Sequence, residues 1–264
     1  MVHPDTGPWR LVDALTGWAA STLWVDWLLL GGSLGRGAGD ERSDVDAGLG
    51  VRTAPDAPFS HRRDAVLASA RALDETADTL VQPLGTADAP ADHLVVQYRD
   101  GRQLSVVVSP AESRHDLPPE TLVLLDRSGR LGRPAPADRY AAAPPTRREW
   151  AFLGWVAVGD AHRHACRGRV WRALRSLDEA RASCWRLWAA DHGVTFPAFG
   201  VVSVENAGIA PPPGLERTHP PSLTTTDLLA AVDAVATVLG PLTAPHDVEG
   251  IRDVTLARLR ETVR

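Results

Sequence analysis

LLLGGSLGRGAGDERSDVDAGLGV, residues 28–51, is the stretch that decides the fold. An apolar run ends in two glycines and a serine, and two aspartates separated by one valine follow after a glycine-rich segment. The run WVDWLLL before Gly31 is typical of a buried strand, and SDVDAGLGV alternates between polar and apolar residues like a second strand. The stretch therefore predicts two strands joined by a glycine-rich connection.

The second strand carries a candidate metal site. Residues two apart on an extended strand point to the same face, so Asp44 and Asp46 project together with Cα atoms roughly 7 Å apart. Two carboxylates this close repel each other, and a bound Mg²⁺ compensates them while keeping positions for water and substrate phosphates. A polar strand edge would show the same Asp-Val-Asp pattern, so the residues before the pair decide between the two interpretations.

Those preceding residues predict an anion site. Gly31 and Gly32 let the backbone approach a ligand closely, and Ser33 at a helical start offers a hydroxyl and free amides to phosphate oxygens. Other glycine motifs fail here, because no Gly-Lys-Ser/Thr occurs and GRGAGD lacks the last glycine of a dinucleotide fingerprint. The sequence thus places a phosphate site beside a metal site.

The composition excludes several classes of chemistry. The chain has 264 residues, a net charge of -5 and a pI near 6.0, which disfavours a nucleic-acid surface and favours a small-molecule partner. All 28 basic residues are arginine, so a phosphate-binding lysine and a Schiff-base lysine are both excluded. Any phosphate must be held by arginine, backbone amides or a metal ion.

We expect a cytoplasmic location and no membrane association. The opening MVHPDTGPWRLVDALTGW lacks a basic start with an apolar core, and no stretch approaches 18 apolar residues. Cys166 and Cys184 both fall in a segment of helical pattern, which favours reduced, buried thiols over a disulfide or a metal site.

Periodicity predicts an α+β fold with two domains. The first part should contain a helix at the opening, a helix over about residues 60–81, a hairpin over 93–110 that turns at Asp100-Gly101, and a strand within ETLVLLDRSGRLG. The proline-rich residues 133–149 form the candidate linker, and helical patterns follow over 150–192, 224–239 and 246–262. We expect a small mixed-sheet domain over residues 1–140 and an all-helical, substrate-side domain over residues 146–264.

The opening stretch resembles the nucleotidyltransferases with a DNA polymerase β-like core. Their pattern is Gly-Ser, a spacer of about ten residues and then Asp-x-Asp, and Gly32-Ser33 followed by Asp44-Val45-Asp46 matches it. A small α/β domain followed by a helical domain is similar to the antibiotic-modifying branch, which adenylylates aminoglycosides or lincosamides. The resemblance covers residues 25–110 by motif and the rest of the chain only by architecture.

The resemblance implies a reaction and a set of roles. A hydroxyl of a small-molecule acceptor would attack the α-phosphorus of ATP or another nucleoside triphosphate, and pyrophosphate would leave. Asp44 and Asp46 would hold Mg²⁺, and Gly32 and Ser33 would bind the terminal phosphates. For Arg36 and Arg42 two interpretations stay open, because each either adds positive charge at the phosphates or is a solvated loop residue.

One position departs from the family pattern. The family usually carries a third carboxylate on a later strand, and in GRQLSVVVSP this position falls on Ser105, which shares a strand face with Gln103 and Val107. Serine cannot replace an aspartate as a base or metal ligand of comparable strength. Either the protein is an enzyme whose base lies elsewhere, with Glu149 and Asp160 as candidates, or Ser105 impairs transfer.

Two other functions remain as alternatives. The first is a nucleotide-binding pseudoenzyme or regulatory module that lacks the third catalytic carboxylate. The second is an antitoxin-like nucleotidyltransferase that acts on a protein partner, although such proteins are typically shorter. Zinc chemistry at His162 and His164 is disfavoured, because two histidines two residues apart on a helix face different directions.

Overall fold

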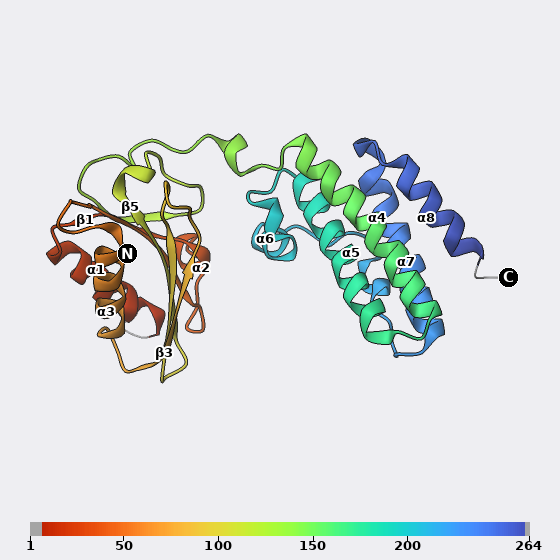
Figure 1. Cartoon of the computed structure of the whole chain (residues 1–264), viewed down its shortest axis with the longest axis horizontal. Helices are drawn as coiled ribbons and strands as arrows, with labels where there is room; N and C mark the ends of the chain where they lie inside the picture. The colour runs from red at the N-terminus through yellow and green to blue at the C-terminus, as the bar shows by residue number, and fades with distance from the viewer. Residues whose placement is uncertain (1–6, 262–264) are drawn as a thin grey trace. The chain divides into compact units, whose positions relative to one another are not determined.

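A computed structural model describes residues 7–261, and the chain divides into two compact units between Ala135 and Pro136 (Figure 1). The first unit is built on a six-stranded mixed sheet with helices, and the second unit is helical. The α+β fold class predicted from the sequence is confirmed. The division lies within the proline-rich residues 133–149, but a helix already begins at Pro144, so the last part of the predicted linker is helical.

The sheet of the first unit has the order β3-β4-β5-β2-β1-β6, and its one parallel pair is β2 with β5. Helices α1, α2 and α3 and the short 3-10 helix η1 complete this unit. The strands are β1 Val25–Leu30, β2 Val45–Val51, β3 Thr76–Pro83, β4 Asp92–Tyr98, β5 Gln103–Pro110 and β6 Leu122–Asp126. The helices are α1 Pro8–Ser21, α2 Gly32–Gly35, α3 Phe59–Arg71 and η1 Ala111–Ser113.

Strict alternation along the strands gives the sheet two different faces. On β4 every second residue is buried, and the same period runs through most of β5. The buried set joins apolar residues of α1 and α3 in one core, which includes Leu15, Val66, Leu94 and Val106. Helices α1 and α3 both contribute side chains to this core. On the opposite face of the sheet, residues of β2, β4 and β5 are less buried, and several of them are polar.

Trp27 closes part of that opposite face with apolar packing. Its indole lies across β2 at Gly50, where an added Cβ would stand 2.1 Å from the ring, and its Nε1–H donates to the carbonyl oxygen of Ala111 at 3.1 Å. Trp27 and Leu29 form a small cluster there with Ala111 and Leu131. Close packing against Trp27 therefore requires glycine at position 50. The polar part of this face lies at the start of β2, near Asp46.

The helix predicted over residues 60–81 is wrong beyond its first half. Helix α3 ends at Arg71, and residues 76–83 form the edge strand β3, paired with β4. The alanine-rich part favours a helix, whereas Thr76, Thr79 and Val81 bring the β-branched side chains that favour a strand. Leu80, in the second half of the predicted helix, is 52% exposed on this strand.

Other predicted elements of the first unit are confirmed. The hairpin of β4 and β5 turns at Asp100-Gly101, where Gly101 has φ +92°, a value that favours glycine. The opening helix, the strands on either side of the glycine-rich connection and the later strand β6 are also present. The thiols differ from expectation, because Cys184 is buried but Cys166 is exposed near the end of its helix.

The second unit packs its longest helices around one apolar core. The core draws on α4, α5, α7 and α8, and it includes Trp155, whose Nε1–H donates to Thr243 Oγ1 at 2.9 Å. The helical patterns predicted over 150–192 and 224–239 are confirmed, the first as two helices that turn at Gly168. The pattern predicted over 246–262 is confirmed from Glu249 to Glu261, and residue 262 lies outside the described residues. The helices are α4 Pro144–Cys166, α5 Val170–Asp191, α6 Val201–Asn206, α7 Thr225–Thr243 and α8 Glu249–Glu261, with the 3-10 turns η2 Ala137–Tyr140, η3 Pro197–Phe199, η4 Leu215–Thr218 and η5 Ala244–His246.

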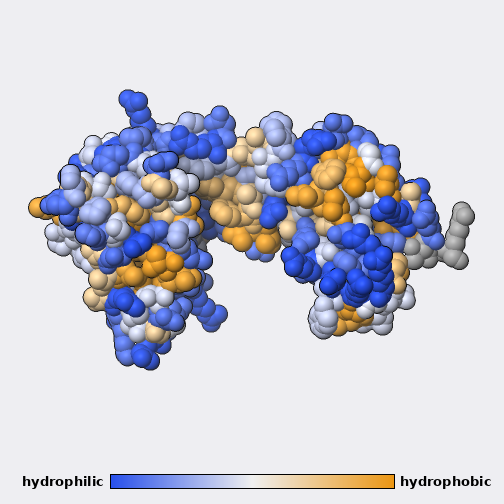
Figure 2. Space-filling view, viewed as in Figure 1, coloured by the Kyte–Doolittle hydropathy of each residue, from blue (hydrophilic) through white to orange (hydrophobic). Residues whose placement is uncertain are grey.

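The segment Thr225–His246 is long and apolar enough to cross a membrane by length and composition, and half of its apolar window is buried within the structure. A core helix passes the same test, and α7 supplies Leu228, Val232 and Leu239 to the core of its unit. On the surface of both units, apolar patches alternate with hydrophilic ones (Figure 2).

A buried carboxylate ties β1 to two loops of the first unit. Asp26 is fully buried, and it accepts hydrogen bonds from Arg52 Nε at 2.9 Å, Ser128 Oγ at 2.6 Å and Arg130 Nε at 2.9 Å. Burial alone would raise the pKa of Asp26, but the hydrogen bonds from Ser128 and Arg52 and the two arginine charges lower it below the ordinary value. The folded unit therefore favours the charged form.

We predict that Asp26→Asn destabilises the protein by about 3 kcal/mol at neutral pH, because it leaves two arginines without their buried counter-charge. The lowered pKa makes this contribution fully present above the unfolded pKa and lost as the pH falls through the folded one, so the deficit should shrink in acid. Urea unfolding at several pH values measures both effects. The exposed pair Arg99–Glu75 supplies the control, and Glu75→Ala should cost under about 1 kcal/mol.

Candidate active site

The connection after β1 holds the carboxylate of Asp46 against its backbone. The N–H of Gly31 donates to the carbonyl oxygen of Asp46 at 2.8 Å, which joins the two strands at this end. Gly32 has φ +59°, and a Cβ added there would lie 2.2 Å from Asp46 Oδ2. Only glycine meets both demands, the left-handed backbone and the space for a carboxylate.

Asp44 and Asp46 form a pair of like charges at the start of β2. Asp44 directly precedes the strand, Asp46 is its second residue, and both are exposed. Desolvation of the Asp46 carboxyl, and then the charge of Asp44, raise the pKa of Asp46, while a hydrogen bond from Ser105 and the charges of His93 and Arg36 act in the opposite direction. The net shift is upward, and desolvation of the carboxyl is its largest cause.

The pair fits a hard divalent cation. Mg²⁺ takes one or two protein carboxylates and completes its shell with water and substrate phosphates, which matches two carboxylates open to solvent. Residues 7–261 contain no group of three or more His, Cys, Asp and Glu side chains placed to hold a metal ion. Two carboxylates alone leave most positions of an octahedral Mg²⁺ shell to other ligands.

A row of polar side chains continues from Asp46 across the sheet. Ser105 lies directly opposite Asp46 in the parallel register of β2 and β5. His93 of β4 brings Nε2 to 2.7 Å from Ser105 Oγ, and its Nδ1 is 3.1 Å from Oε1 of Gln82 on β3. Asp46, Ser105, His93 and Gln82 thus lie on four adjacent strands, one residue from each.

Sequence reasoning found Ser105 but missed His93 and Gln82. The signal was present, because β4 alternates and His93 occupies one of its less buried positions. A local pattern does not specify the register between β4 and β5. In that register His93 pairs with Val107, and its side chain reaches Ser105 diagonally across the two strands. Gln82 could not be found, since its segment was predicted to follow a helix rather than to form a strand.

The structure treats the two candidate arginines differently. Arg36 follows α2, its charge lowers the pKa of Asp46, and its Nη1 is 3.7 Å from Oε2 of Glu120. Arg42 is exposed in the turn before Asp44, and its backbone N–H donates to Asp40 Oδ1 at 2.9 Å. Arg36 is therefore near the carboxylate pair, whereas no contact in residues 7–261 joins the Arg42 side chain to it.

Ser33 is the first residue after the Gly32 turn and is partly exposed, within the four-residue helix α2. Its carbonyl oxygen accepts the N–H of Ala38 at 2.9 Å, which closes the glycine-rich loop. The first N–H groups of a helix have no partner inside it, so the backbone here offers donors to a ligand. The hydroxyl of Ser33 therefore belongs to a short donor-rich segment beside Asp46.

The alternative base candidates lie in the second unit. Glu149 is exposed on α4, and Asp160 of the same helix pairs with Arg163 at 2.6 Å. His162 approaches the Cys166 sulfur at 3.6 Å one turn further along. These side chains belong to a different compact unit from Asp44 and Asp46.

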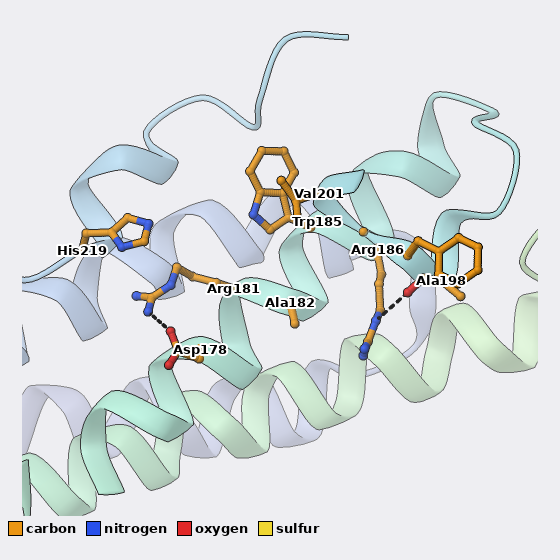
Figure 3. A pocket seen from close by; sticks show the side chains of 10 residues that line it. Asp178, Arg181, Ala182, Trp185, Arg186, Ala198, Val201 and His219 are labelled. Carbon is orange, nitrogen blue, oxygen red and sulfur yellow. Dashed lines mark hydrogen bonds and ion pairs between the residues drawn. The ribbon is translucent and has the colours of Figure 1, made fainter. Parts of the chain in front are cut away.

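The second unit also contains a separate pocket of about 260 Å³ beside α5 (Figure 3). Its charged groups are engaged within the protein, because Arg181 pairs with Asp178 and donates to the Thr218 carbonyl at 2.7 Å, and Arg186 donates to Ala198 at 3.2 Å. Apolar surface from Trp185, Phe199 and Val201 lines the rest of the pocket.

Comparison with known proteins finds distant likeness among solved structures. No family model and no curated protein matches the chain. Among solved structures, the chain is similar to an aminoglycoside 6-adenyltransferase from Bacillus subtilis, with a TM-score of 0.35 and 11% sequence identity over 97% of this chain and 92% of that one.

We predict that Gly32→Ala weakens binding of Mn²⁺, a spectroscopic substitute for Mg²⁺, by at least about tenfold, because the new methyl displaces the Asp46 carboxylate. Titration by electron paramagnetic resonance measures the affinity. Gly37→Ala is the matched control, since Gly37 has φ +72° but open space around an added Cβ. Equal losses in the two variants would assign the effect to backbone strain and contradict the prediction.

Proposed function

We propose that this protein is a metal-dependent nucleotidyltransferase, which transfers a nucleoside monophosphate from a nucleoside triphosphate to a hydroxyl of a small molecule. The observation that carries the proposal is the Asp46 carboxylate held against Gly32, at the start of the Gly-Ser turn. This contact brings a phosphate-binding segment and a carboxylate pair together in one site. The reaction needs both at the same triphosphate.

Each residue has a chemical role in the proposal. Gly32, Ser33 and the adjacent backbone amides bind the terminal phosphates, and the guanidinium of Arg36 adds positive charge where this lysine-free chain has no ammonium group. Asp44 and Asp46 hold Mg²⁺, which when bound stabilises negative charge on the phosphate oxygens. The acceptor hydroxyl then attacks the α-phosphorus, and pyrophosphate leaves.

The acceptor and the cellular setting remain part of the proposal. The net charge of -5 favours a small molecule over a nucleic acid. Aminoglycosides and lincosamides are the first acceptors to test, which would make antibiotic resistance the biological role and the cytoplasm its place.

A second candidate function rests on Ser105. A neutral hydroxyl stands beside Asp46 in the strand register, where a third carboxylate would complete the metal site. A regulatory module that binds the nucleotide without transferring it needs no such carboxylate. This alternative predicts Mg²⁺-dependent nucleotide binding with no release of pyrophosphate.

We predict that the double variant Asp44→Asn, Asp46→Asn loses Mg²⁺-dependent ATP binding and lowers pyrophosphate release by at least about a thousandfold, or about 4 kcal/mol of activation free energy. Calorimetry and a pyrophosphate assay with a panel of hydroxylated antibiotics measure the two effects. Asp13→Asn, an exposed aspartate of α1, serves as the control and should leave both unchanged. Unaltered ATP affinity in the double variant would refute the site.

We predict that Ser105→Asp leaves pyrophosphate release equal to or below that of the parent, although it strengthens metal binding by adding a carboxylate next to Asp46. The reason is that the parent site already has its means of removing the proton. A large gain in release would show instead that the parent lacks its catalytic acid, and the regulatory-module alternative would then replace the enzyme.

A further inference from the structure

The hydrogen-bonded chain from Gln82 through His93 to Ser105 lies on the face of the sheet opposite the core of the first unit. The buried core lies on the other face of the sheet, and the strands pair through their backbones without these side chains. The three residues are exposed or partly buried, and they come from three different strands. Yet they are aligned at 3.1 Å and 2.7 Å and end beside Asp46.

The contact with Gln82 selects one form of the neutral imidazole of His93. With Oε1 of Gln82 as the acceptor, the Nδ1 that faces it carries the hydrogen. The Nε2 atom then presents a lone pair to Ser105 Oγ, so the single O–H of Ser105 has two acceptors, His93 Nε2 and the Asp46 carboxylate. A hydroxyl bonded to a base that a third group orients is the arrangement that activates a serine oxygen for proton transfer.

His93 lies on the same face of the sheet as Asp46. Asp46 is next to Ser105 in the strand register, and Asp44 and Arg36 act electrostatically on the Asp46 carboxyl. Asp92, the neighbour of His93 in the chain, is buried and pairs with Arg63 at 2.9 Å, so it belongs to the opposite face. The hydrogen-bonded chain from Gln82 to Ser105 therefore ends beside the aspartate pair.

We propose that Ser105 and His93 together remove the proton from the acceptor hydroxyl, in the place where a third carboxylate would do so. This inference rests on the proposed nucleotidyl transfer. As the acceptor oxygen forms its bond to the α-phosphorus, its proton passes to Ser105 Oγ, and the Ser105 proton passes to His93 Nε2. The bond from phosphorus to the leaving oxygen breaks, pyrophosphate departs with the electron pair, and His93 returns its proton to water.

The three residues have different roles in this step. Ser105 is the catalytic residue that touches the acceptor hydroxyl, and His93 is the proton acceptor behind it. Gln82 is a positioning residue, because its carbonyl oxygen fixes which nitrogen of His93 carries the hydrogen. The residues that bind Mg²⁺ and the triphosphate stay as proposed, so loss of His93 should affect the rate of transfer and not the binding of the nucleotide.

The experiment compares His93→Gly and Ser105→Ala with the parent, and His61→Gly, an exposed histidine of α3, is the matched control. We expect kcat for pyrophosphate release to fall by about 100-fold or more in the two test variants, with affinity for ATP and Mg²⁺ within about twofold of the parent. Added imidazole should restore His93→Gly by about tenfold or more, and it should not change Ser105→Ala or the control. A structural role of His93 would not produce this rescue.

A second measurement uses the resting protein. Nitrogen-15 spectra of the imidazoles should show the Nδ1–H form of His93 in the parent, with a changed Nε2 signal in Ser105→Ala. The Nε2–H form would overturn the inference, because Ser105 would then have no base. Label from an α-phosphate-labelled triphosphate that remained on Ser105 after denaturation would also overturn it, since Ser105 would then be a nucleophile.

The outcomes separate this inference from the function on which it rests. A parent that transfers nucleotide and a His93→Gly variant that keeps full kcat would overturn the inference alone. A parent that releases no pyrophosphate with any acceptor would overturn both. Loss of kcat with retained nucleotide affinity and imidazole rescue would support both.

Discussion

The contact between the Asp46 carboxylate and the backbone of Gly32 is the constraint on which the candidate site depends. It requires glycine at a left-handed position, and it joins the end of β1 to the start of β2, where Gly31 donates to the Asp46 carbonyl. Since β2 pairs in parallel with β5, the same register sets Ser105 beside Asp46. A shift of one residue in this pairing would turn the aspartate into the core.

The two faces of the sheet differ in role, because one packs into the core and the other carries the candidate site. One face packs with α1 and α3 into a continuous core, and at the edge of the site Trp27 covers the glycines of β2 on the other face. Buried Asp26 accepts charged hydrogen bonds from Arg52 and Arg130, which ties the segments after β2 and β6 to β1. The exposed carboxylates are thus carried at the start of a strand whose other face packs into the core.

The sequence was informative where spacing alone defines geometry. Asp44 and Asp46, the glycine-serine turn and the Asp100-Gly101 hairpin all follow from residues close together in the chain. His93 and Gln82 depended on register between strands, and Arg42 on the path of an exposed loop, neither of which a local pattern specifies. The error over residues 72–81 has the same origin, because pairing with β4 overrode the helical tendency that continued from α3.

The parallel pairing of β2 with β5 also bears on how such a protein changes over evolutionary time. The aspartate pair belongs to the hairpin of β1 and β2, whereas Ser105 and His93 belong to the hairpin of β4 and β5. The two halves of the site are therefore inherited on separate pieces of chain that meet along a single seam. Under the proposed function, changes confined to the second hairpin would stop transfer and leave nucleotide binding intact, so an enzyme and a nucleotide sensor would differ at few positions.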